Sequence, residues 1–357
     1  MQSFSETILS WYDTYGRDLP WRRTRDPYSI WLSEIILQQT RIAQGQAYWE
    51  RFLAVWPDVQ ALAAASEDEV LRLWQGLGYY SRARNLHAAA QQIVAAGRFP
   101  ETLAGIRALK GVGDYTAAAI GSIAFGLPAA VVDGNVYRVL ARHYGIETPV
   151  GSTAAKKEFT ALAQSLLPAD RPGDFNQGMM DFGALQCTPV APLCAICPLA
   201  GQCAALATGR VEALPVREKG AAVQTRRFDY VYVRFRGRTA IRRRGPGDIW
   251  QGLYEPLVND QRLEKEDARH KNTPICAREA KKQVLGNKTG LLCARQPLLL
   301  RSGVKHQLTH RTLLVDFYLW EPEEEPALPE GYVWIEEAEL DRYAKPRLFE
   351  LLLESLP

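Results

Sequence analysis

The sequence lacks three features: a long hydrophobic run, a strong excess of charge, and cysteines spread along the chain. No apolar stretch among the 357 residues approaches the roughly 20 that a membrane-spanning helix needs. The opening residues, MQSFSETILSWYDTYG, have no basic region followed by an apolar one, which argues against a signal peptide. The net charge of +3 is too small to indicate nucleic-acid binding by itself. We therefore expect a cytoplasmic protein that does not enter a membrane.

The periodicity of the apolar residues divides the chain into two parts. A content of 47% apolar and 23% charged residues is ordinary for a globular protein, and the length suggests two or three domains. A helical period predicts helices at 4–16, 28–56, 66–75, 81–96, 114–125, 134–144, 153–167 and 174–186. Residues 206–226 lose this period and are interpreted as a linker. A period of two then predicts strands at 228–237, 238–244, 313–320 and 332–335, with helical character at 262–285 and 345–355.

The stretch 109–140 contains two features that a nucleic-acid enzyme would use. A helix ending at Lys110 is followed by a tight turn at Gly111 and Gly113, which leaves backbone N–H groups bare at the start of the next helix. Such a helix-hairpin-helix suits a DNA phosphate, because the contact ignores base sequence. Asp133 opens another helix about twenty residues later. Taken alone, the turn is equally an ordinary turn and Asp133 equally a helix N-cap.

Glu34 is the most informative single residue. It has Ile30 and Trp31 one helical turn before it and Leu37 one turn after it, so it lies on a largely apolar stripe. Removal from water would raise its pKa, as a general acid near neutral pH requires. The alternative is a glutamate at the edge of the stripe that pairs with an arginine.

Four cysteines crowd into the seventeen residues 187–203 with the spacing C-x6-C-x2-C-x5-C, while Cys276 and Cys293 stand alone. This crowding indicates one metal site in a reducing compartment rather than a disulfide framework. Zinc is the default for four thiolates, but the six-residue first gap fits a cubane iron–sulfur cluster. The ligands would be Cys187, Cys194, Cys197 and Cys203.

The motifs together resemble a known family. The segments LPWR, WLSEIILQQT, GLGYYSRARNLH, LKGVGDYTAAAI, VVDGNVYRVLAR and FNQGMMDFGA, followed by the cysteines, occur in the order seen in the MutY family of adenine DNA glycosylases. The resemblance covers about Leu19 to Cys203. It implies a helix-hairpin-helix glycosylase core in which residues 25–131 form a six-helix barrel, and residues 1–24 with 132–205 form a domain holding a [4Fe-4S] cluster.

The resemblance also implies roles for individual residues. Glu34 matches the general acid that protonates a flipped adenine at N7, and Asp133 matches the carboxylate that stabilises the sugar cation or captures it. Asn135 matches an amide that helps to position them. Tyr115 stands where the lyases of the superfamily carry a Schiff-base lysine, so base removal with little strand cleavage is expected. Positions that line the base pocket or wedge the DNA fall on Trp21, Arg22, Leu37, Gln39, Thr40 and Tyr79.

Residues 227–357 resemble the Nudix-related α+β domain of the same family, which checks for 8-oxoguanine opposite adenine. Residues 278–283 carry Lys and Gln where a hydrolase would need its acidic pair, which argues against nucleotide hydrolysis. Thr309 and His310 match the hydroxyl and imidazole of a lesion-reading loop, whereas Leu308 replaces its aromatic residue. A histidine in a loop is also commonly structural.

The leading hypothesis is therefore a monomeric, monofunctional glycosylase that acts on double-stranded DNA containing A:8-oxoG or A:G mispairs. In a bacterium it would be associated with the nucleoid. An endonuclease III-like lyase or a thymine-mismatch glycosylase is the alternative enzyme. A non-catalytic iron–sulfur protein that binds DNA is the alternative of a different class, but it would need neither Glu34 nor Asp133.

Overall fold

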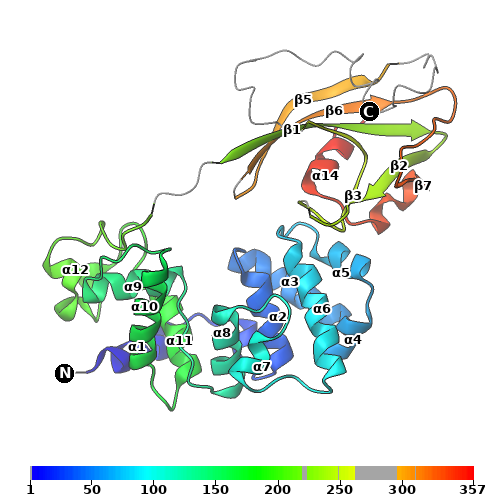
Figure 1. The fold of residues 1–357 in the computed structure, drawn as a ribbon. Helices are drawn as coiled ribbons and strands as arrows, with labels where there is room; N and C mark the ends of the chain where they lie inside the picture. Colours follow the sequence, from blue (N-terminus) through cyan, green and yellow to red (C-terminus); the bar gives the residue numbers. More distant parts are fainter. Residues whose placement is uncertain (1, 219–222, 248, 262–295, 310) are drawn as a thin grey trace. The chain divides into compact units, whose positions relative to one another are not determined.

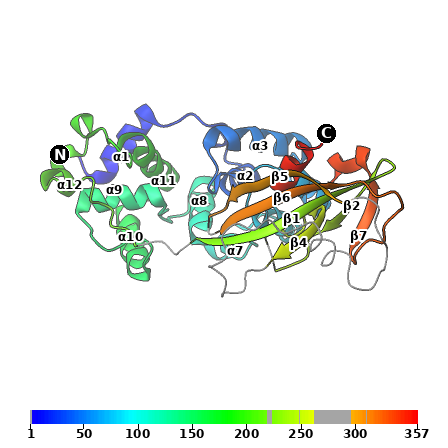
Figure 2. The same cartoon turned by 90° about the horizontal axis from the view of Figure 1, so that it is seen from above.

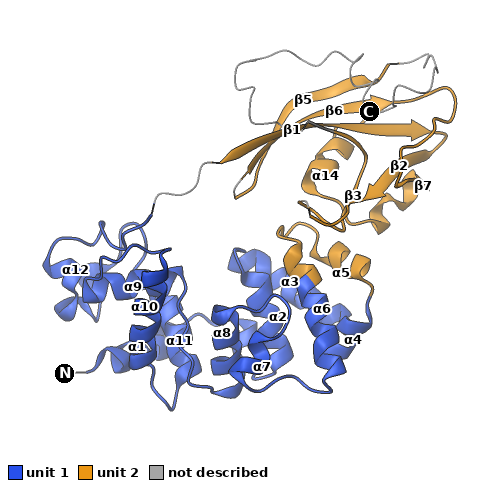
Figure 3. Cartoon of the chain, in the orientation of Figure 1, with its two compact units in different colours: residues 1–65, 85–219 blue, residues 66–84, 220–357 orange. Residues whose placement is uncertain are grey.

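The structure is a computed structural model that describes residues 2–218, 223–247, 249–261, 296–309 and 311–357 (Figure 1). The chain forms two compact units, coloured separately in Figure 3. Unit 1 comprises residues 1–65 and 85–219, and unit 2 comprises residues 66–84 and 220–357. This division differs from the expected boundaries, because it does not separate 25–131 from 132–205 and it assigns 66–84 to the C-terminal unit. The finer division into barrel and cluster domains stays a prediction.

Unit 1 is built from helices joined by short connections. The sequence explains several of their starts: Ser3 and Glu6 form a capping box on the first helix, and Asp26 accepts hydrogen bonds from two backbone amides of the second. No described helix of the chain is long and apolar enough to cross a membrane. The helices are α1 (Phe4–Tyr15), α2 (Pro27–Leu37), α3 (Ile42–Val55), α4 (Val59–Ala64), α6 (Ser81–Ala95, which begins in unit 2), α7 (Leu103–Arg107), α8 (Asp114–Phe125), α9 (Gly134–Tyr144), α10 (Thr153–Leu166), α11 (Pro172–Asp181) and α12 (Ala204–Ala207).

Within unit 1 the helices gather in two groups. Helices α1, α9, α10, α11 and α12 lie together, and α2, α3, α7 and α8 lie together, in both views (Figures 1 and 2). The first group encloses a core that includes Ile8, Phe159 and Phe182, and helices α2 and α8 share a second core around Ile30 and Ala119. Helix α11 contacts both α1 and α8, so it links the two groups. Burial of these apolar side chains is the main stabilising contribution.

The prediction of one long helix over residues 28–56 is wrong. Helix α2 ends at Leu37, Gln39 adopts a left-handed backbone with φ 55°, and α3 starts at Ile42. Neither glycine nor proline marks this break, and the apolar period runs through it, so the sequence pattern could not reveal it. The helix expected to end at Lys110 is the short α7, which ends at Arg107. The helices predicted at 114–125 and 134–144 are confirmed.

Unit 2 contains a mixed sheet with the strand order β3-β2-β1-β6-β5, in which β4 also pairs with β1 and β7 with β2. Strands β1 and β6 are parallel over ten residues, and the other pairs are antiparallel. The expected α+β architecture of the C-terminal part is confirmed. The strands are β1 (Gln224–Phe235), β2 (Arg238–Arg243), β3 (Tyr254–Glu255), β4 (Leu257–Gln261), β5 (Leu298–Gln307), β6 (Arg311–Trp320) and β7 (Tyr332–Glu336).

Alternation along β1 places its side chains in two cores. Phe228, Tyr230 and Tyr232 face helix α14 (Arg347–Leu353), while Val231 and Val233 face the other side with Trp320. Strand β5 was not predicted, because its burial pattern is mostly exposed and it contains Gly303 with a positive φ. The helix expected at 262–285, with Cys276, and the isolated Cys293 lie outside the described residues.

Candidate active site

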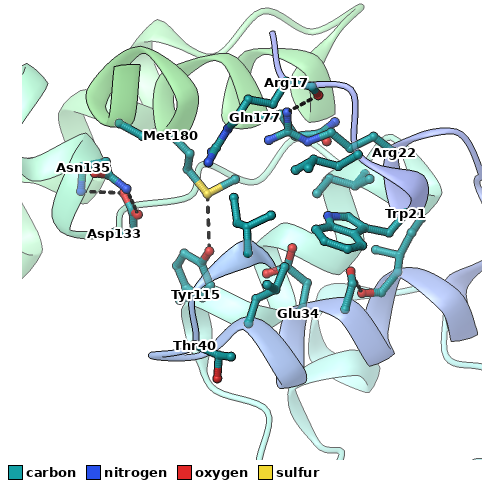
Figure 4. Close-up of a pocket in the computed structure, with 17 residues that line it drawn as sticks. Arg17, Trp21, Arg22, Glu34, Thr40, Tyr115, Asp133, Asn135, Gln177 and Met180 are labelled. Atoms are coloured by element: carbon teal, nitrogen blue, oxygen red, sulfur yellow. Dashed lines mark hydrogen bonds between the residues drawn. The ribbon is translucent and has the colours of Figure 1, made fainter. Parts of the chain in front are cut away.

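A pocket with a volume of about 220 Å³ lies within unit 1 and takes its walls from segments far apart in the sequence (Figure 4). Helices α2, α8 and α11 each contribute side chains, as do the start of α9 and the segment 17–22. Both carboxylates singled out from the sequence line it. The lining residues are Arg17, Leu19, Trp21, Arg22, Ile30, Ser33, Glu34, Leu37, Thr40, Ile42, Tyr115, Ile123, Asp133, Asn135, Gln177, Met180 and Ala184.

Glu34 projects from the middle of α2 into this pocket. Its neighbours Ile30 and Ser33 are buried, and the side chain itself is only partly accessible, from the pocket. Burial raises the pKa of Glu34, the Arg22 guanidinium lowers it, and the nearby Asp133 carboxylate raises it; the net value is about 7. A carboxyl group that titrates near pH 7 can be protonated before a reaction and ionised after it, as general acid–base catalysis requires.

Asp133 occupies the N-cap of α9. Its Oδ1 accepts hydrogen bonds from the backbone amides of Asn135 at 2.9 Å and Val136 at 2.8 Å, and its Oδ2 accepts one from the Asn135 side chain at 2.8 Å. Burial raises the pKa of Asp133, while these three hydrogen bonds act in the opposite direction. The two interpretations of Asp133 from the sequence do not exclude each other, because the same carboxylate caps helix α9 and lines the cavity.

Asn135 is held in place by a second residue. Its Oδ1 accepts a hydrogen bond of 2.9 Å from Arg138, a buried arginine on the same helix. Arg138 also donates to the carbonyl oxygens of Gly183 at 2.6 Å and Cys187 at 2.7 Å. This arginine thus connects the amide beside Asp133 to the first of the four clustered cysteines.

Arg22 carries a fixed positive charge on the pocket wall. Asp181, which is fully buried, accepts hydrogen bonds from both terminal nitrogens of Arg22 at 2.7 and 2.9 Å. Arg17 donates to the same carboxylate through its backbone N–H at 2.8 Å and through its side chain. Burial alone would raise the pKa of Asp181, but the hydrogen bonds from Arg22 and Arg17 lower it below its ordinary value, so the carboxylate is ionised.

Tyr115 lies on α8 beside Glu34 and Met180 (Figure 4). Its hydroxyl donates to the Met180 Sδ at 3.4 Å, and its proximity also lowers the pKa of Glu34. Burial, together with the Glu34 and Asp133 carboxylates, raises the pKa of Tyr115 well above its ordinary value. The pocket therefore presents a neutral phenol beside Glu34.

The other predicted pocket positions are partly brought together. Trp21, Arg22, Leu37 and Thr40 line the cavity, whereas Gln39 is exposed in the turn after α2 and is not among the lining residues. The sequence did not predict nine of the lining residues, among them Arg17, Gln177, Met180 and Ala184. The last three recur at intervals of three and four in the FNQGMMDFGA segment, and this helical spacing could have identified them.

The glycine hairpin has the expected backbone geometry. Gly111 adopts a φ of +78°, and a Cβ there would come within 2.6 Å of the Asn85 Cβ, so only glycine fits. Gly113 is the N-cap of α8, which has no side-chain cap. The acidic residue in the first turn, Asp114, is paired with Arg107 and Lys156. The N-terminal amides of α8 thus have no side-chain cap, which is the backbone arrangement expected of a phosphate-binding turn.

Tyr79 and Thr309 belong to unit 2, and their side-chain hydroxyls are hydrogen-bonded to each other. Tyr79 has a positive φ of 46° and is largely exposed, between the glycine turn and the start of α6. His310, the other residue of the predicted lesion-reading pair, lies outside the described residues.

The four clustered cysteines line one small cavity of about 30 Å³ with Arg142 at its edge. Arg142 donates to the Cys187 Sγ at 3.4 Å, and burial raises the pKa of the Cys197 thiol to about 11. Within the described residues, no group of three or more His, Cys, Asp and Glu side chains is arranged to hold a single metal ion. Four thiols around a shared space are a donor set that fits a cluster with one thiolate per iron.

Comparison with known proteins relates both parts of the chain to characterised families. Residues 32–168 match the family described as HhH-GPD superfamily base excision DNA repair protein, and residues 229–355 match the NUDIX domain. The chain is 47% identical over 214 residues to the adenine DNA glycosylase of Homo sapiens, which is 57% of this chain and 39% of that protein. It is 35% identical over 254 residues to the adenine DNA glycosylase of Buchnera aphidicola subsp. Acyrthosiphon pisum, which is 70% of this chain and 73% of that protein.

A solved structure of a thermostable thymine-DNA glycosylase has a TM-score of 0.53 and 33% identity. That match covers 57% of this chain and 95% of the other. The match to the human relative thus spans well under half of that protein, while the match to the Buchnera relative spans nearly three quarters of it. The predicted combination of a helix-hairpin-helix glycosylase core with a Nudix-like domain is confirmed.

Proposed function

Because the chain belongs to the adenine DNA glycosylase family, we propose that it removes adenine from double-stranded DNA as the first step of base excision repair. One observation supports this proposal above the others: Glu34 and Asp133, 99 positions apart in the chain, line the same pocket. Enzymes that hydrolyse glycosidic bonds commonly use two carboxyl groups that lie at the same cavity.

In the proposed reaction the target adenine leaves the duplex and enters the pocket, since the reacting bond is not accessible in a base stack. Protonated Glu34 donates its proton to N7 of the adenine. The bond between C1′ and N9 then breaks, its electron pair goes to the base, and adenine leaves as a neutral molecule. A pKa of about 7 for Glu34 supports this role, because a substantial fraction of the group is protonated at neutral pH.

Asp133 stabilises the positive charge that develops on the sugar, either as an ion or by a transient bond to C1′. Its hydrogen bonds from Asn135 hold the carboxylate in one orientation. Water then adds to C1′, any bond to Asp133 breaks with its electron pair returning to that carboxylate, and the water gives up its proton to the Glu34 carboxylate, which restores the starting state. The product is an abasic site with an intact phosphate backbone.

We propose further that the adenine is one mispaired with 8-oxoguanine or guanine. The Nudix-like match over residues 229–355 and the contact between Thr309 and Tyr79 support a lesion-reading role for the C-terminal part. Base removal proceeds without strand cleavage, because the phenol of Tyr115 cannot form the imine that a lysine forms with C1′.

A [4Fe-4S] cluster is proposed on Cys187, Cys194, Cys197 and Cys203, which line one cavity. When bound, the cluster would cross-link these four positions through iron–thiolate bonds. The chain's own residues there do the positioning: Arg142 and Arg138 hold the Cys187 segment against α9, and Arg138 also holds Asn135. No step of base removal passes through the cluster.

An excision assay on defined duplexes tests the function. The protein is incubated with duplexes containing A:8-oxoG, A:G, A:C or T:G, and the products are separated with and without alkali. We expect adenine release from the first two and strand breaks only after alkali. If thymine is released from T:G while the A:8-oxoG duplex stays intact, the result would instead favour thymine-DNA glycosylase activity, which is the activity in the name of the similar solved structure.

The variant Glu34→Gln separates an enzyme from a DNA-binding protein. A glutamine keeps the size and hydrogen-bonding groups of Glu34 but cannot donate an acidic proton. We expect excision to fall by at least about a hundredfold, a typical contribution of a general acid, while duplex binding is retained. Equal loss of binding and excision would contradict the catalytic assignment.

A further inference from the structure

The segment 66–84 is sequentially part of the helical half of the chain, yet it belongs to unit 2 (Figure 3). It consists of helix α5 (Glu67–Trp74), the turn from Gly76 to Tyr79, and the first residues of α6. Apolar and polar contacts both hold it there. Leu71 lies so close to Gly252 that a Cβ on the glycine would approach its Cδ1 to 3.0 Å. Asp68 accepts a hydrogen bond of 3.0 Å from the Tyr254 hydroxyl.

Gln75 lies between helix α5 and the turn that contains Tyr79, and it contacts the C-terminal end of the chain. Its Oε1 accepts a hydrogen bond of 3.0 Å from the backbone N–H of Lys345, and its Nε2 donates to the Glu350 carboxylate on α14. Both ends of one side-chain amide are therefore bound by residues that lie about 270 positions away in the chain. Gln75 is also the C-cap of α5, so the turn that contains Tyr79 starts at the residue that is tied down.

The two partners of Gln75 are themselves held firmly. Lys345 is buried, and its ammonium group donates to the carbonyl oxygen of Leu340 at 2.5 Å, which closes the 340–345 segment on itself. Glu350 is half-buried and also pairs with Arg347 at 3.2 Å. A hydrogen bond to a charged, partly buried carboxylate contributes more than a neutral, exposed one.

The turn that follows Gln75 connects it to Tyr79 through a constrained backbone. Gly76, Gly78 and Tyr79 all have positive φ angles, so the turn has one tight backbone path. Trp74 donates to the Gly78 carbonyl oxygen at 3.0 Å, and Arg82 donates to the same oxygen at 3.2 Å. These two hydrogen bonds restrict the backbone of the turn, so we expect the position of Tyr79 to follow that of Gln75.

We propose that Gln75 is a positioning residue that fixes the Tyr79 turn to the C-terminal Nudix-like part, so that Tyr79 and Thr309 are presented to DNA as one piece. This inference rests on the proposed function, because the contact between Tyr79 and Thr309 supports there the lesion-reading role of the C-terminal part. Gln75 contacts no substrate. Its contribution is to selectivity: the preference for adenine opposite 8-oxoguanine over adenine opposite guanine depends on its two hydrogen bonds.

A charge exchange tests this tie. Gln75→Glu sets one carboxylate against Glu350 and removes the donor, whereas Glu350→Gln leaves an acceptor for Gln75. The double variant Gln75→Glu with Glu350→Gln restores one donor and one acceptor in reversed order, and its residue 75 can still accept from Lys345. Gln60→Glu is the matched control, because Gln60 is exposed on α4 in unit 1 and its substitution adds the same charge.

Single-turnover excision of adenine opposite 8-oxoguanine and opposite guanine is measured for each full-length variant. We expect Gln75→Glu to lower the ratio of the two rates about tenfold, a usual size for a directly coupled pair, and the double variant to recover it to within about threefold. Hydrogen exchange of the amides in residues 76–84 should rise in Gln75→Glu and return in the double variant, with Gln60→Glu unchanged in both measurements.

Three results would overturn the proposal. An unchanged ratio in Gln75→Glu, with faster exchange, would show a tie without influence on selectivity. Additive effects in the double variant would show that residues 75 and 350 do not act as a pair. If Gln75→Glu does not fold, Gln75→Met tests the same ratio with similar volume and no hydrogen bonds, and an unchanged ratio there overturns the proposal. Failure of the wild-type protein to release adenine from any duplex contradicts the proposed function instead, and the exchange measurement still tests the tie.

Discussion

Asp181 binds the guanidinium of Arg22 through both of its carboxylate oxygens, and it does so without exposing any of its own surface. The pair places a cation of fixed orientation on the wall of the pocket that Glu34 also lines. The pKa of Glu34 therefore reflects two opposing influences: burial raises it, and this guanidinium lowers it.

Asp181→Asn should disturb both stability and the ionisation of Glu34. Loss of the carboxylate leaves Arg17 and Arg22 without their shared partner, and breaking a buried ion pair costs about 3–5 kcal/mol of the free energy of unfolding. The uncompensated guanidinium would lower the pKa of Glu34, so excision should decline at a lower pH than in the wild type. Urea unfolding and a pH–rate profile measure the two effects, and Asp181→Glu, which keeps the charge, is the control. A profile unchanged by Asp181→Asn would contradict the coupling.

Excision should depend on pH in a bell shape. The reaction needs protonated Glu34, so the rate should fall as the pH rises through about 7, the pKa of Glu34. It also needs ionised Asp133, whose pKa burial raises above its ordinary value, so the acidic limb should lie above that of an exposed aspartate. Single-turnover rates between pH 4.5 and 9 test both limbs. A rate that continues to rise above pH 8 would exclude Glu34 as the acid.

Glu34→Gln should stabilise the fold at alkaline pH. The pKa of Glu34 is about 7 in the folded protein and near 4.5 when exposed, so its contribution to stability is complete below pH 4.5 and is lost as the pH rises through 7. The neutral glutamine removes this loss, and at pH 8 the variant should gain on the order of 1–3 kcal/mol over the wild type. Thermal melting at pH 5 and pH 8 gives the comparison. A gain of the same size at both values would mean that ionisation of Glu34 is not its cause.

Cys197→Ser should abolish cluster binding while leaving the pocket carboxylates in place. A serine hydroxyl cannot replace a thiolate at an iron corner, so we expect loss of visible absorbance and of the roughly four irons per chain that a cubane carries. Cys276→Ser, outside the quartet, is the control. Purified protein with one zinc per chain and no sulfide would contradict the cluster assignment.

Much of this arrangement could be predicted, because local signals and function coincide in the same residues. Asp26 and Asp133 cap their helices as their positions suggest, and the alternation at 228–237 predicted the strand β1, although not the burial of both of its faces. The stripe around Glu34 indicated burial, and burial is what raises its pKa.

The unpredicted features depend on contacts between distant segments. No residue type near Gln39 predicts the end of α2. The helix ends because Gln39 adopts a left-handed backbone, and neither glycine nor proline stands at this position. In the sequence, Asp181 is one acidic residue among apolar neighbours. Its partners Arg17 and Arg22 lie some 160 positions earlier, so only the folded structure shows the ion pairs. Likewise, no pattern within 66–84 indicates that it packs with residues 340–350. Such pairings are properties of the folded chain.

The capping role of Asp133 has a consequence for turnover. Three donors converge on its two oxygens, and α9 begins where they meet. An ester between this carboxylate and the sugar would remove the negative charge and draw one oxygen away from the helix terminus, so the adduct would be formed at the expense of the cap. Re-forming the cap favours release of the sugar, and any covalent species at this position would be short-lived in the wild-type enzyme.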